Sequence, residues 1–195
     1  MTEEPLTARG AATYRRMIEV ATREFAEHGI AGARVERIVA GARTNKAQLY
    51  AYFGSKEGLF DAIFFGSLER IVNVAPIDAT DLADWAVRLY DEYLRSPDLI
   101  RLATWARLER RPAGHLVDDP DRLDDVKLRA IAEAQTAGLV RTGDPFDLMA
   151  LVIAMSMAWS PVSNVYAATA DEPAELHERR RALLRDSVRR AVAPD

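Results

Sequence analysis

The stretch that most constrains the fold is RVERIVAGARTNKAQLYAYFGSK, from Arg34 to Lys56, which has the pattern of two short helices joined by a tight turn. The first helix has one apolar face at helical spacing, formed by Val35, Ile38, Val39 and Ala42. The pattern is interrupted from Gly41 to Thr44. Asn45 can then cap a second helix, because its side chain can accept a hydrogen bond from an otherwise unpaired backbone N–H. The sequence therefore predicts a helical hairpin here.

The second of these helices has a polar side that is compatible with two roles. Its polar tips come from Lys46, Gln48 and Tyr50, whereas Leu49 and Phe53 are expected to face inward. A short helix with these side chains on a small scaffold can enter a groove of DNA. The alternative is a helical hairpin whose polar side is simply solvated. Spacing alone leaves both interpretations open.

Charge is distributed unevenly along the 195 residues, whose net charge is −4. Residues 1–56 hold nine Lys and Arg against six Asp and Glu, whereas the remainder holds 17 basic against 24 acidic residues. A basic first quarter on an acidic body is typical of a DNA-binding segment attached to a domain that does not bind DNA.

Composition excludes several classes of site. The chain has no cysteine, which rules out disulfides, Cys-based zinc sites and a Cys nucleophile. The three histidines, His28, His115 and His177, lack ligand spacing, so we expect no metal site and no cofactor. No run approaches the ~18 apolar residues that span a membrane. The first residues have no apolar core like that of a signal peptide, so we expect a cytoplasmic protein.

Helical periodicity continues along the chain, and no strand pattern is present. We expect helices over about 8–28, 35–41, 45–51 and 55–73, from about 81 and 97 onward, and over 121–137, 145–159 and 171–192. The expected caps are Asn45, Ser55, Thr80 or Asp81, Asp144 and Asp171. Gly29 is placed to end the first helix. The prediction is an all-α fold of about nine helices, with loops at 30–34 and 111–120.

The segment from Pro145 to Trp159 is apolar nearly all round, which indicates burial on two sides. One side can face the protomer core, and the other needs a partner. The last helix has apolar residues on one face and arginines on the opposite face; the apolar residues are Leu176, Leu183, Leu184, Val188 and Ala191. Two such helices can form a four-helix bundle with a symmetry mate. We therefore expect a homodimer through helices near 145–160 and 172–192.

Residues 14–60 resemble the N-terminal domain of the TetR-type (tetracycline-repressor-like) bacterial transcriptional regulators. Three motifs carry the resemblance: Phe25-Ala26-Glu27-His28-Gly29, Ile38-Val39-Ala40-Gly41-Ala42, and the run LYAYFGSKEGL from Leu49 to Leu59. The resemblance implies a three-helix helix-turn-helix DNA-binding domain over 1–54. It also implies a helical ligand-binding and dimerisation domain over 55–195, where the likeness is limited to the helical layout.

The turn departs from the family pattern. Many members have Gly-Val-Ser where this chain has Arg43-Thr44-Asn45. The turn favours a residue that tolerates positive φ, so Arg43 is expected to cost roughly 1 kcal/mol of backbone strain, unless Gly41 reshapes the turn. A Ser or Thr often caps the second helix, and Ala33-Arg34 stands in its place.

The resemblance implies that this domain binds a double-stranded DNA operator. Lys46 and Gln48 would face base edges, Lys toward guanine and Gln toward adenine. The remaining candidates would contact phosphates, which fixes register without reading sequence; they are Arg34, Thr44, Asn45, Tyr50, Tyr52 and Lys56. Tyr52 has packing as an alternative role, and for Phe53 packing is the favoured one.

The resemblance also implies that the C-terminal domain binds a small-molecule effector that lowers DNA affinity. Aromatic residues cluster in this part of the chain, although most lie on apolar stripes where packing is the alternative role. Our candidates for an apolar pocket are Phe64, Trp85, Tyr93, Trp105, Met149 and Ile153.

The predicted function is a ligand-responsive DNA-binding regulator, a repressor that binds a palindromic operator as a dimer. The alternatives are a regulator without an effector, a helical module that binds protein, and a helical enzyme. A glycine-rich phosphate loop, a nucleophile elbow and HExxH are all absent from the sequence, which disfavours the enzyme.

Overall fold

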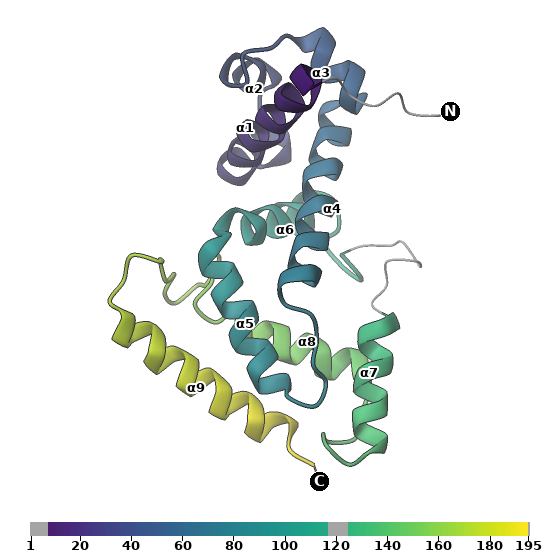
Figure 1. Cartoon of the computed structure of the whole chain (residues 1–195), viewed down its shortest axis with the longest axis vertical. Coiled ribbons are helices and arrows are strands. Elements are labelled where there is room, and N and C mark those ends of the chain that lie inside the picture. The colour runs from purple at the N-terminus through teal and green to yellow at the C-terminus, as the bar shows by residue number, and fades with distance from the viewer. Residues whose placement is uncertain (1–7, 117–124, 195) are drawn as a thin grey trace. The chain divides into compact units, whose positions relative to one another are not determined.

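The structure, a computed structural model, describes residues 8–116 and 125–194, and these residues form nine helices and no strand (Figure 1). The prediction of an all-α fold is confirmed. The helices are α1 (Ala8–Gly32), α2 (Val35–Gly41), α3 (Lys46–Phe53), α4 (Lys56–Val74), α5 (Leu82–Arg95), α6 (Pro97–Glu109), α7 (Asp125–Thr136), α8 (Pro145–Ser156) and α9 (Ala174–Val192).

Most of the predicted caps are confirmed. The Asn45 side chain accepts from the Gln48 backbone N–H, and Ser55 Oγ accepts from the Gly58 N–H, both at 2.9 Å. Asp81 accepts from the Asp84 N–H. Asp144 accepts from the Phe146 N–H, with Pro145 at the first helical position. Each cap satisfies a backbone donor that the helix itself leaves unpaired.

Three predicted boundaries are wrong. Residues 30–32 are a last helical turn beyond Gly29 and not part of a loop, although Gly29 does interrupt the helix with φ 74°. Helix α8 ends at Ser156, three residues before Trp159. The last helix begins at Ala174 after Pro173, so Asp171 is not its cap. Residues 121–124 of the predicted seventh helix lie outside the described residues.

By packing, the chain divides into two compact units. The first contains the described residues up to Leu68 together with Arg101–Gly114, and the second contains Glu69–Ile100 and the described residues from His115 onward. Helices α4 and α6 therefore each contribute residues to both units. The domain boundary at residue 54 stays a prediction.

The first unit is built around a buried aromatic and aliphatic core. Phe25 of α1 meets Phe60 of α4 edge to face at 5.3 Å, and Phe60 stacks on Phe64 at 5.8 Å. Leu49 is the fully buried residue of α3. Tyr14 packs against Phe53 at 5.1 Å, which favours the packing role expected for Phe53. This core fixes the short helices α2 and α3 on α1 and α4.

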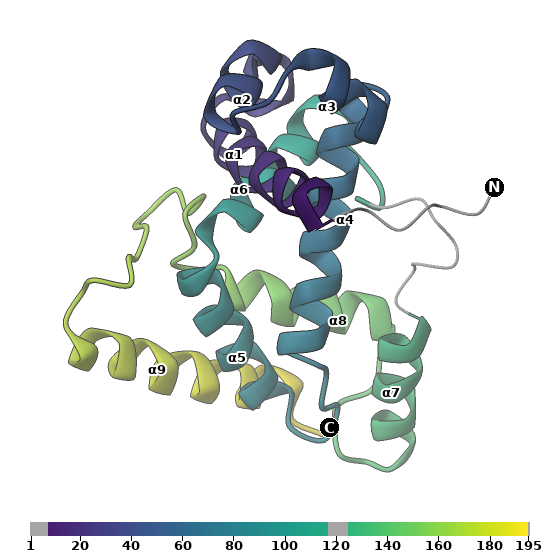
Figure 2. The same cartoon turned by 45° about the horizontal axis from the view of Figure 1, so that its top comes forward.

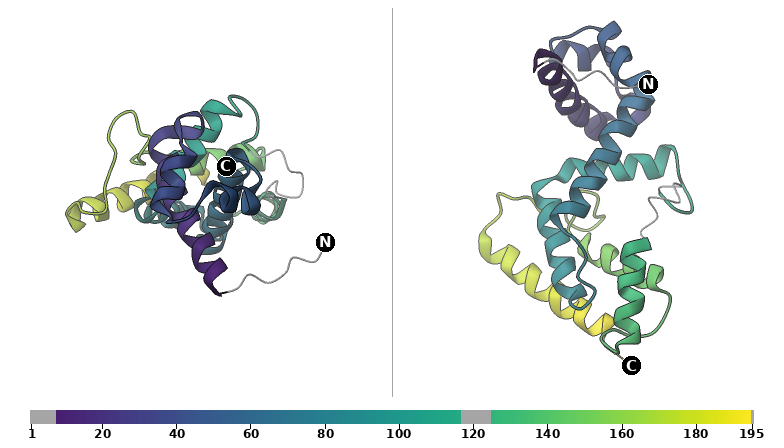
Figure 3. Two further views of the ribbon diagram at one scale, coloured as in Figure 1. Left: turned by 90° about the horizontal axis from the view of Figure 1, so that it is seen from above. Right: turned by 45° about the vertical axis from the view of Figure 1, so that its right-hand side comes forward.

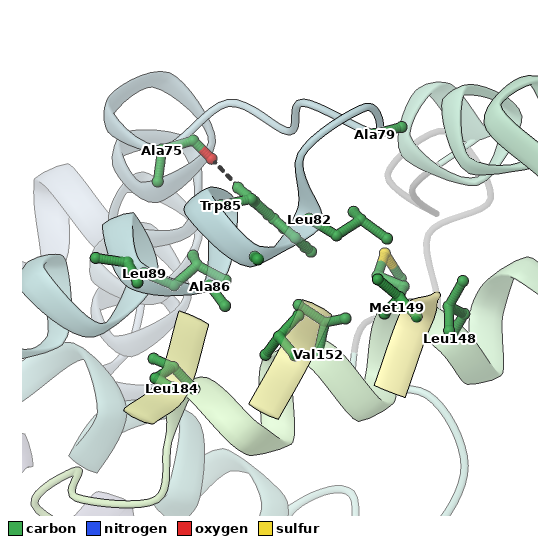
Figure 4. Packing of buried hydrophobic residues seen from close by; sticks show 14 of the residues in the cluster. Ala75, Ala79, Leu82, Trp85, Ala86, Leu89, Leu148, Met149, Val152 and Leu184 are labelled. Atoms are coloured by element: carbon green, nitrogen blue, oxygen red, sulfur yellow. Dashed lines mark hydrogen bonds between the residues drawn. The ribbon is translucent and has the colours of Figure 1, made fainter. Parts of the chain in front are cut away.

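The second unit is organised around α5, which packs against both α8 and α9. Figure 3 shows α9, in yellow, running beside α5. Trp85 is almost fully buried, and its indole N–H donates to the Ala75 carbonyl at 3.0 Å (Figure 4). Side chains from the three helices converge on this core, among them Leu82, Val152 and Leu184 (Figure 4).

A long connection, residues 157–173, leads from α8 to α9 (Figure 2). Within this connection, the Ala168 N–H donates to the Trp159 carbonyl at 3.0 Å. In the part of the chain that the structure describes, none of the helices is both long and apolar enough to cross a membrane.

Candidate DNA-binding surface and sensor unit

The turn between α2 and α3 has the strained geometry that the sequence predicts. Arg43 has φ 53° and is the only non-glycine residue with positive φ among the described residues. The Thr44 N–H donates to the Val39 carbonyl at 3.0 Å, and the Arg43 N–H donates to Ala40 at 3.2 Å. These hydrogen bonds hold the chain in the left-handed conformation, which sets the direction in which α3 leaves the turn.

The polar residues at and after the start of α3 are accessible to solvent. Asn45, Lys46 and Tyr50 are exposed, and Gln48 is partly exposed. The Thr44 hydroxyl donates to Gln48 Oε1 at 2.5 Å. This bond uses one lone pair of the amide oxygen and orients the amide. The oxygen has a second lone pair, so the predicted adenine contact, which uses both amide atoms, can form while the bond to Thr44 is kept.

Lys46 is paired with an acidic residue that the sequence analysis did not single out. Its Nζ lies 2.5 Å from Glu36 Oε1 of α2, and both side chains are more than half exposed. The hydrogen bond to Glu36 raises the pKa of Lys46, and the same bond lowers the pKa of Glu36. Because solvent screens an exposed pair, it holds Lys46 weakly enough for another acceptor to displace Glu36.

Three further residues predicted to contact phosphates differ in their surroundings. Tyr50 is exposed, whereas the Tyr52 ring packs against Tyr14 at 5.6 Å. The Lys56 ammonium donates to the carbonyls of Ala31 and Ala33, both at 3.3 Å. Lys56 therefore also closes the end of α1, a contact across more than 20 residues that spacing does not predict.

A buried carboxylate joins α1 to α2. Glu24, 9 % exposed, accepts from the Arg34 backbone N–H and from Arg37 Nε, both at 2.8 Å. Burial opposes the charge, but these hydrogen bonds outweigh burial, so the pKa of Glu24 lies below its ordinary value. Glu24 thus satisfies the N–H of Arg34, the residue before α2, while the Arg34 side chain does not cap the N–H groups inside the first turn as a Ser or Thr would. The Arg34 side chain is exposed.

The end of α6 holds the end of α1 within the same unit. Glu109 accepts from the Ile30 N–H at 3.1 Å and from the Ala31 N–H at 2.7 Å. Trp105 donates its indole N–H to the Ala26 carbonyl at 3.2 Å. These bonds satisfy backbone groups on both sides of the interruption at Gly29.

The six predicted pocket residues do not belong to one unit. Phe64 and Trp105 lie in the first unit, and Trp85, Tyr93, Met149 and Ile153 lie in the second. Phe64, Trp85, Tyr93 and Met149 are buried, and Ile153 packs on the second unit's core. Trp85 and Trp105 have the hydrogen bonds described above. Ligand binding by these residues stays a prediction.

The second unit has an open hollow of about 510 Å³ that the sequence analysis did not identify. Its lining comes from α9 and from the connection before it: Trp159, Tyr166, Leu176, Arg179, Arg180 and Leu183. Trp159 of this lining meets the Tyr90 ring edge to face at 5.9 Å, and the Tyr90 hydroxyl is 2.8 Å from Nδ1 of the buried His177. Burial raises the pKa of Tyr90. One sequence signal could have indicated this hollow. Leucine and arginine occur together at helical spacing on α9, at Leu176, Arg179, Arg180 and Leu183, but such a mixture is also typical of a solvated helix face.

A helix-turn-helix with an exposed polar second helix, joined to a separate helical unit, defines the class of DNA-binding transcriptional regulators. Sequence profiles identify the family. Residues 17–63 match "Bacterial regulatory proteins, tetR family", and residues 81–190 match "Tetracyclin repressor-like, C-terminal domain". The chain belongs to the tetR family of bacterial regulators, and its predicted role as a DNA-binding transcriptional regulator is confirmed.

Individual relatives agree with this assignment. The chain is 37 % identical over 148 residues to the HTH-type transcriptional repressor SCO4008 of Streptomyces coelicolor, covering 74 % of this chain and 77 % of the relative. The solved structure of the transcriptional regulator SCO4942, also from Streptomyces coelicolor, has a TM-score of 0.76 at 34 % identity, covering 92 % and 98 % of the two chains.

A third similar structure is AibR in complex with isovaleryl coenzyme A and operator DNA. Its TM-score is 0.67 at 18 % identity, and the match covers 90 % of this chain and 97 % of AibR. At this identity the likeness concerns the fold alone.

Proposed function

We propose that the protein represses transcription by binding a palindromic operator as a homodimer, and that a small-molecule effector releases it from DNA. The observation that carries the proposal is the set of exposed polar residues on α3, a helix whose direction is set by the turn at Arg43. Two comparisons support the proposal: SCO4008 is named a repressor, and the AibR structure contains both isovaleryl coenzyme A and operator DNA. We also propose that the protein is not an enzyme and that it is located in the cytoplasm.

In this proposal Lys46 and Gln48 contact base edges. Lys46 exchanges Glu36 for a guanine acceptor, and Gln48 donates its NH₂ from the position that Thr44 fixes. Phosphate contacts come from the N-terminus of α3, where unpaired N–H groups favour anions, and from exposed side chains; these candidates are Arg34, Thr44, Asn45, Tyr50, Tyr52 and Lys56.

The homodimer is proposed through α8 and α9. Helix α8 buries Leu148 and Val152, but leaves Leu151 46 % exposed and Phe146 39 % exposed. Leu183 of α9 is 56 % exposed. An apolar set on two neighbouring helices fits a self-complementary interface across a two-fold axis.

Release by an effector requires two states that differ in their affinity for it. Helix α4 contributes to both units, so a change in its tilt is a direct way to alter the separation of the two α3 helices in the dimer. Operator binding needs these helices roughly 34 Å apart, one turn of DNA.

Selection of bound sequences from random duplex DNA tests the proposal, followed by footprinting on the selected site. We expect a palindromic or near-palindromic footprint and an affinity that falls steeply with salt, since phosphate contacts release counterions. A single asymmetric half-site bound by a monomer would contradict the dimer. Weak, salt-insensitive binding would favour the alternative of a helical module that binds protein.

Substitutions separate the two kinds of contact. Lys46→Ala and Gln48→Ala should relax base preference, whereas Tyr50→Ala, which removes an exposed hydroxyl, should weaken all sequences alike. The selection experiment, repeated with each variant, measures both effects. A change of base preference in Tyr50→Ala would refute its assignment to a phosphate.

A further inference from the structure

The hollow on the second unit has walls of two kinds. Trp159 and Tyr166, from the connection between α8 and α9, and Leu176 and Leu183, from α9, supply apolar surface. Arg179 and Arg180 stand between the two leucines on α9. A volume of about 510 Å³ lies in the range that small organic ligands occupy, and such sites combine apolar walls with a few fixed polar groups.

The two arginines differ in how they are held. Arg180 is 8 % exposed, is paired with Glu172 at 2.5 Å, and lies over the Tyr166 ring at 5.2 Å. Arg179 is exposed and forms no ion pair within the described part of the chain. The other acids of this helix turn, Glu175 and Glu178, are exposed to solvent. The hollow therefore has one arginine that is pre-positioned and one that is available.

Polar groups continue from the hollow toward α5. Arg180 lies against the Tyr90 hydroxyl, which is also 2.8 Å from His177 Nδ1. His177 is 6 % exposed and Ser160 is 4 % exposed. His177 Nε2 and Ser160 Oγ are buried and have no hydrogen-bond partner in the described protein. Neither residue lines the hollow, so these atoms are buried polar surroundings of the site and not contacts for its ligand; leaving them without a partner is costly unless a water satisfies them.

We propose that this hollow is the effector site and that it takes an anionic amphipathic molecule, with a carboxylate or sulfonate at Arg179 and Arg180 and an aryl or branched aliphatic body against Trp159 and Tyr166. The inference rests on the proposed function, since it names the ligand class of the sensor. Planar guanidinium groups pair with such anions bidentately, and the aromatic rings supply the apolar contact.

A second copy of the chain is the competing occupant of the hollow. A two-fold axis pairs each residue with a different residue of the mate unless that residue lies on the axis, so a mate seated here would have to bring one of its own acids, such as Glu175 or Glu178, to Arg179. The exposed apolar residues of α8, Phe146 and Leu151, are not part of the hollow. Leu183 is shared by both surfaces, so the hollow borders the proposed interface.

The site also has a route to the rest of the unit. Glu172 accepts from Arg180, from the Tyr166 hydroxyl at 2.9 Å and from the Thr169 N–H. An anion that shares Arg180 competes with Glu172 and so loosens the connection at 166–172. At the same time it changes the charge beside Tyr90 of α5.

Two fluorescent probes test the proposal on the full chain: anilinonaphthalene sulfonate and N-phenylnaphthylamine, which has the same aryl amine without the sulfonate. Arg179→Gln should weaken binding of the sulfonate about tenfold, because one charged hydrogen bond is lost, and should leave the neutral probe within about twofold. Arg189→Gln, an exposed arginine on the last turn of α9, is the matched control and should change neither.

Equal binding of the sulfonate to Arg179→Gln and to the wild type would overturn the site. Tighter sulfonate binding after dilution to monomer would also overturn the site, because it would mean that the second copy covers the hollow in the dimer. Operator binding without any probe is measured on the same proteins. If the wild type does not bind an operator, the proposed function is refuted, whatever the probes show. If it binds an operator but Arg179→Gln does not change sulfonate binding, the site alone is refuted.

Discussion

At the scale of single residues, Glu24 is the group whose ionisation the fold uses most directly. Its carboxylate is buried, and the same oxygen atoms orient Arg37 and accept from the Arg34 N–H. Glu24→Gln should destabilise the full chain by about 2 kcal/mol near neutral pH, because hydrogen bonds to a charged group are lost. Urea unfolding, followed by circular dichroism, measures this loss.

The effect should depend on pH with a definite sign. The pKa of Glu24 is depressed in the folded protein, so its stabilisation is complete above the unfolded value, about 4.3, and is lost as pH falls through the folded pKa. The stability difference between wild type and Glu24→Gln should therefore shrink in acid. Glu27→Gln, with a side chain 72 % exposed, is the control. A difference that stays constant below pH ~4 would contradict the prediction.

Thr44 should influence which base Gln48 prefers. Thr44→Val removes the hydroxyl that orients the Gln48 amide through Oε1, so the amide loses the fixed direction from which it donates to and accepts from adenine. We expect a weaker preference for adenine at one operator position, by about 1 kcal/mol, in a selection from random DNA. Thr44→Ser keeps the hydroxyl and should retain the wild-type preference. Identical preferences for the Val and Ser variants would count against this role.

Residue-level predictions from the sequence succeeded where the cause is local. The positive φ of Arg43 and the Asn45 cap follow from rules about one turn of chain. The partners of Lys46 and Lys56 could not be predicted, because Glu36 and Ala31 lie 10 and 25 residues away and meet them only after α1, α2 and α4 pack.

At the scale of elements, the interruption of α1 is the most specific feature. Gly29 has φ 74°, and a Cβ there would collide with the Glu109 carboxylate and lie 2.9 Å from the Trp105 ring. Gly29→Ala should therefore cost backbone strain of about 1–3 kcal/mol and a further 1–3 kcal/mol, roughly, for the collision. Urea unfolding of the full chain checks the sum.

Gly54→Ala is the matched control for this experiment. Gly54 has a similar φ of 72°, lies in the same unit, and has open space where a Cβ would project. It should show the strain without the collision. Equal losses of stability for the two variants would mean that contact between α6 and α1 contributes nothing measurable.

Helix starts were predictable and helix ends were less so. Asp81, Asp144 and Ser55 begin helices because short polar side chains capture unpaired N–H groups. The apolar run to Trp159 predicted a longer α8, yet the helix ends at Ser156, where the Ser156 hydroxyl donates to the Ile153 carbonyl at 2.6 Å. Met157 and Trp159 lie beyond the helix end but are partly buried against the core of the second unit, so their apolar character reflects packing without helix.

At the scale of the whole molecule, the proposed dimer makes a prediction about an exposed leucine. Leu151→Asp should leave the folded protomer intact, since the side chain is 46 % exposed, but place two carboxylates in an apolar interface. We expect light scattering to show a monomer and operator affinity to fall at least about tenfold. Val126→Asp, at a 76 % exposed apolar residue of α7, should change neither measurement. A dimeric Leu151→Asp variant would place the interface elsewhere.

The family and the helical architecture could be predicted from the sequence, because a few motifs specify the helix-turn-helix and amphipathic stripes specify the helices. The hollow that we propose as the effector site could not. Apolar stripes pointed to Trp85 and Trp105, which donate hydrogen bonds to Ala75 and Ala26 in different units. Leu176 and Leu183 were assigned to the same face as Leu184, yet only Leu184 is buried. A stripe identifies a buried face, but it does not distinguish a packed core from a binding hollow.

The contact of α6 with α1 bears on how this regulator can be engineered. Regulators of this kind are natural material for chimeras, in which one protein's operator preference is joined to another's effector response. A graft cut after residue 54 or 68 would leave the Ile30 and Ala31 N–H groups without Glu109, and the Ala26 carbonyl without Trp105. A transplant that retains its specificity must bring residues 101–114 with it, so two separate pieces of chain have to be exchanged together.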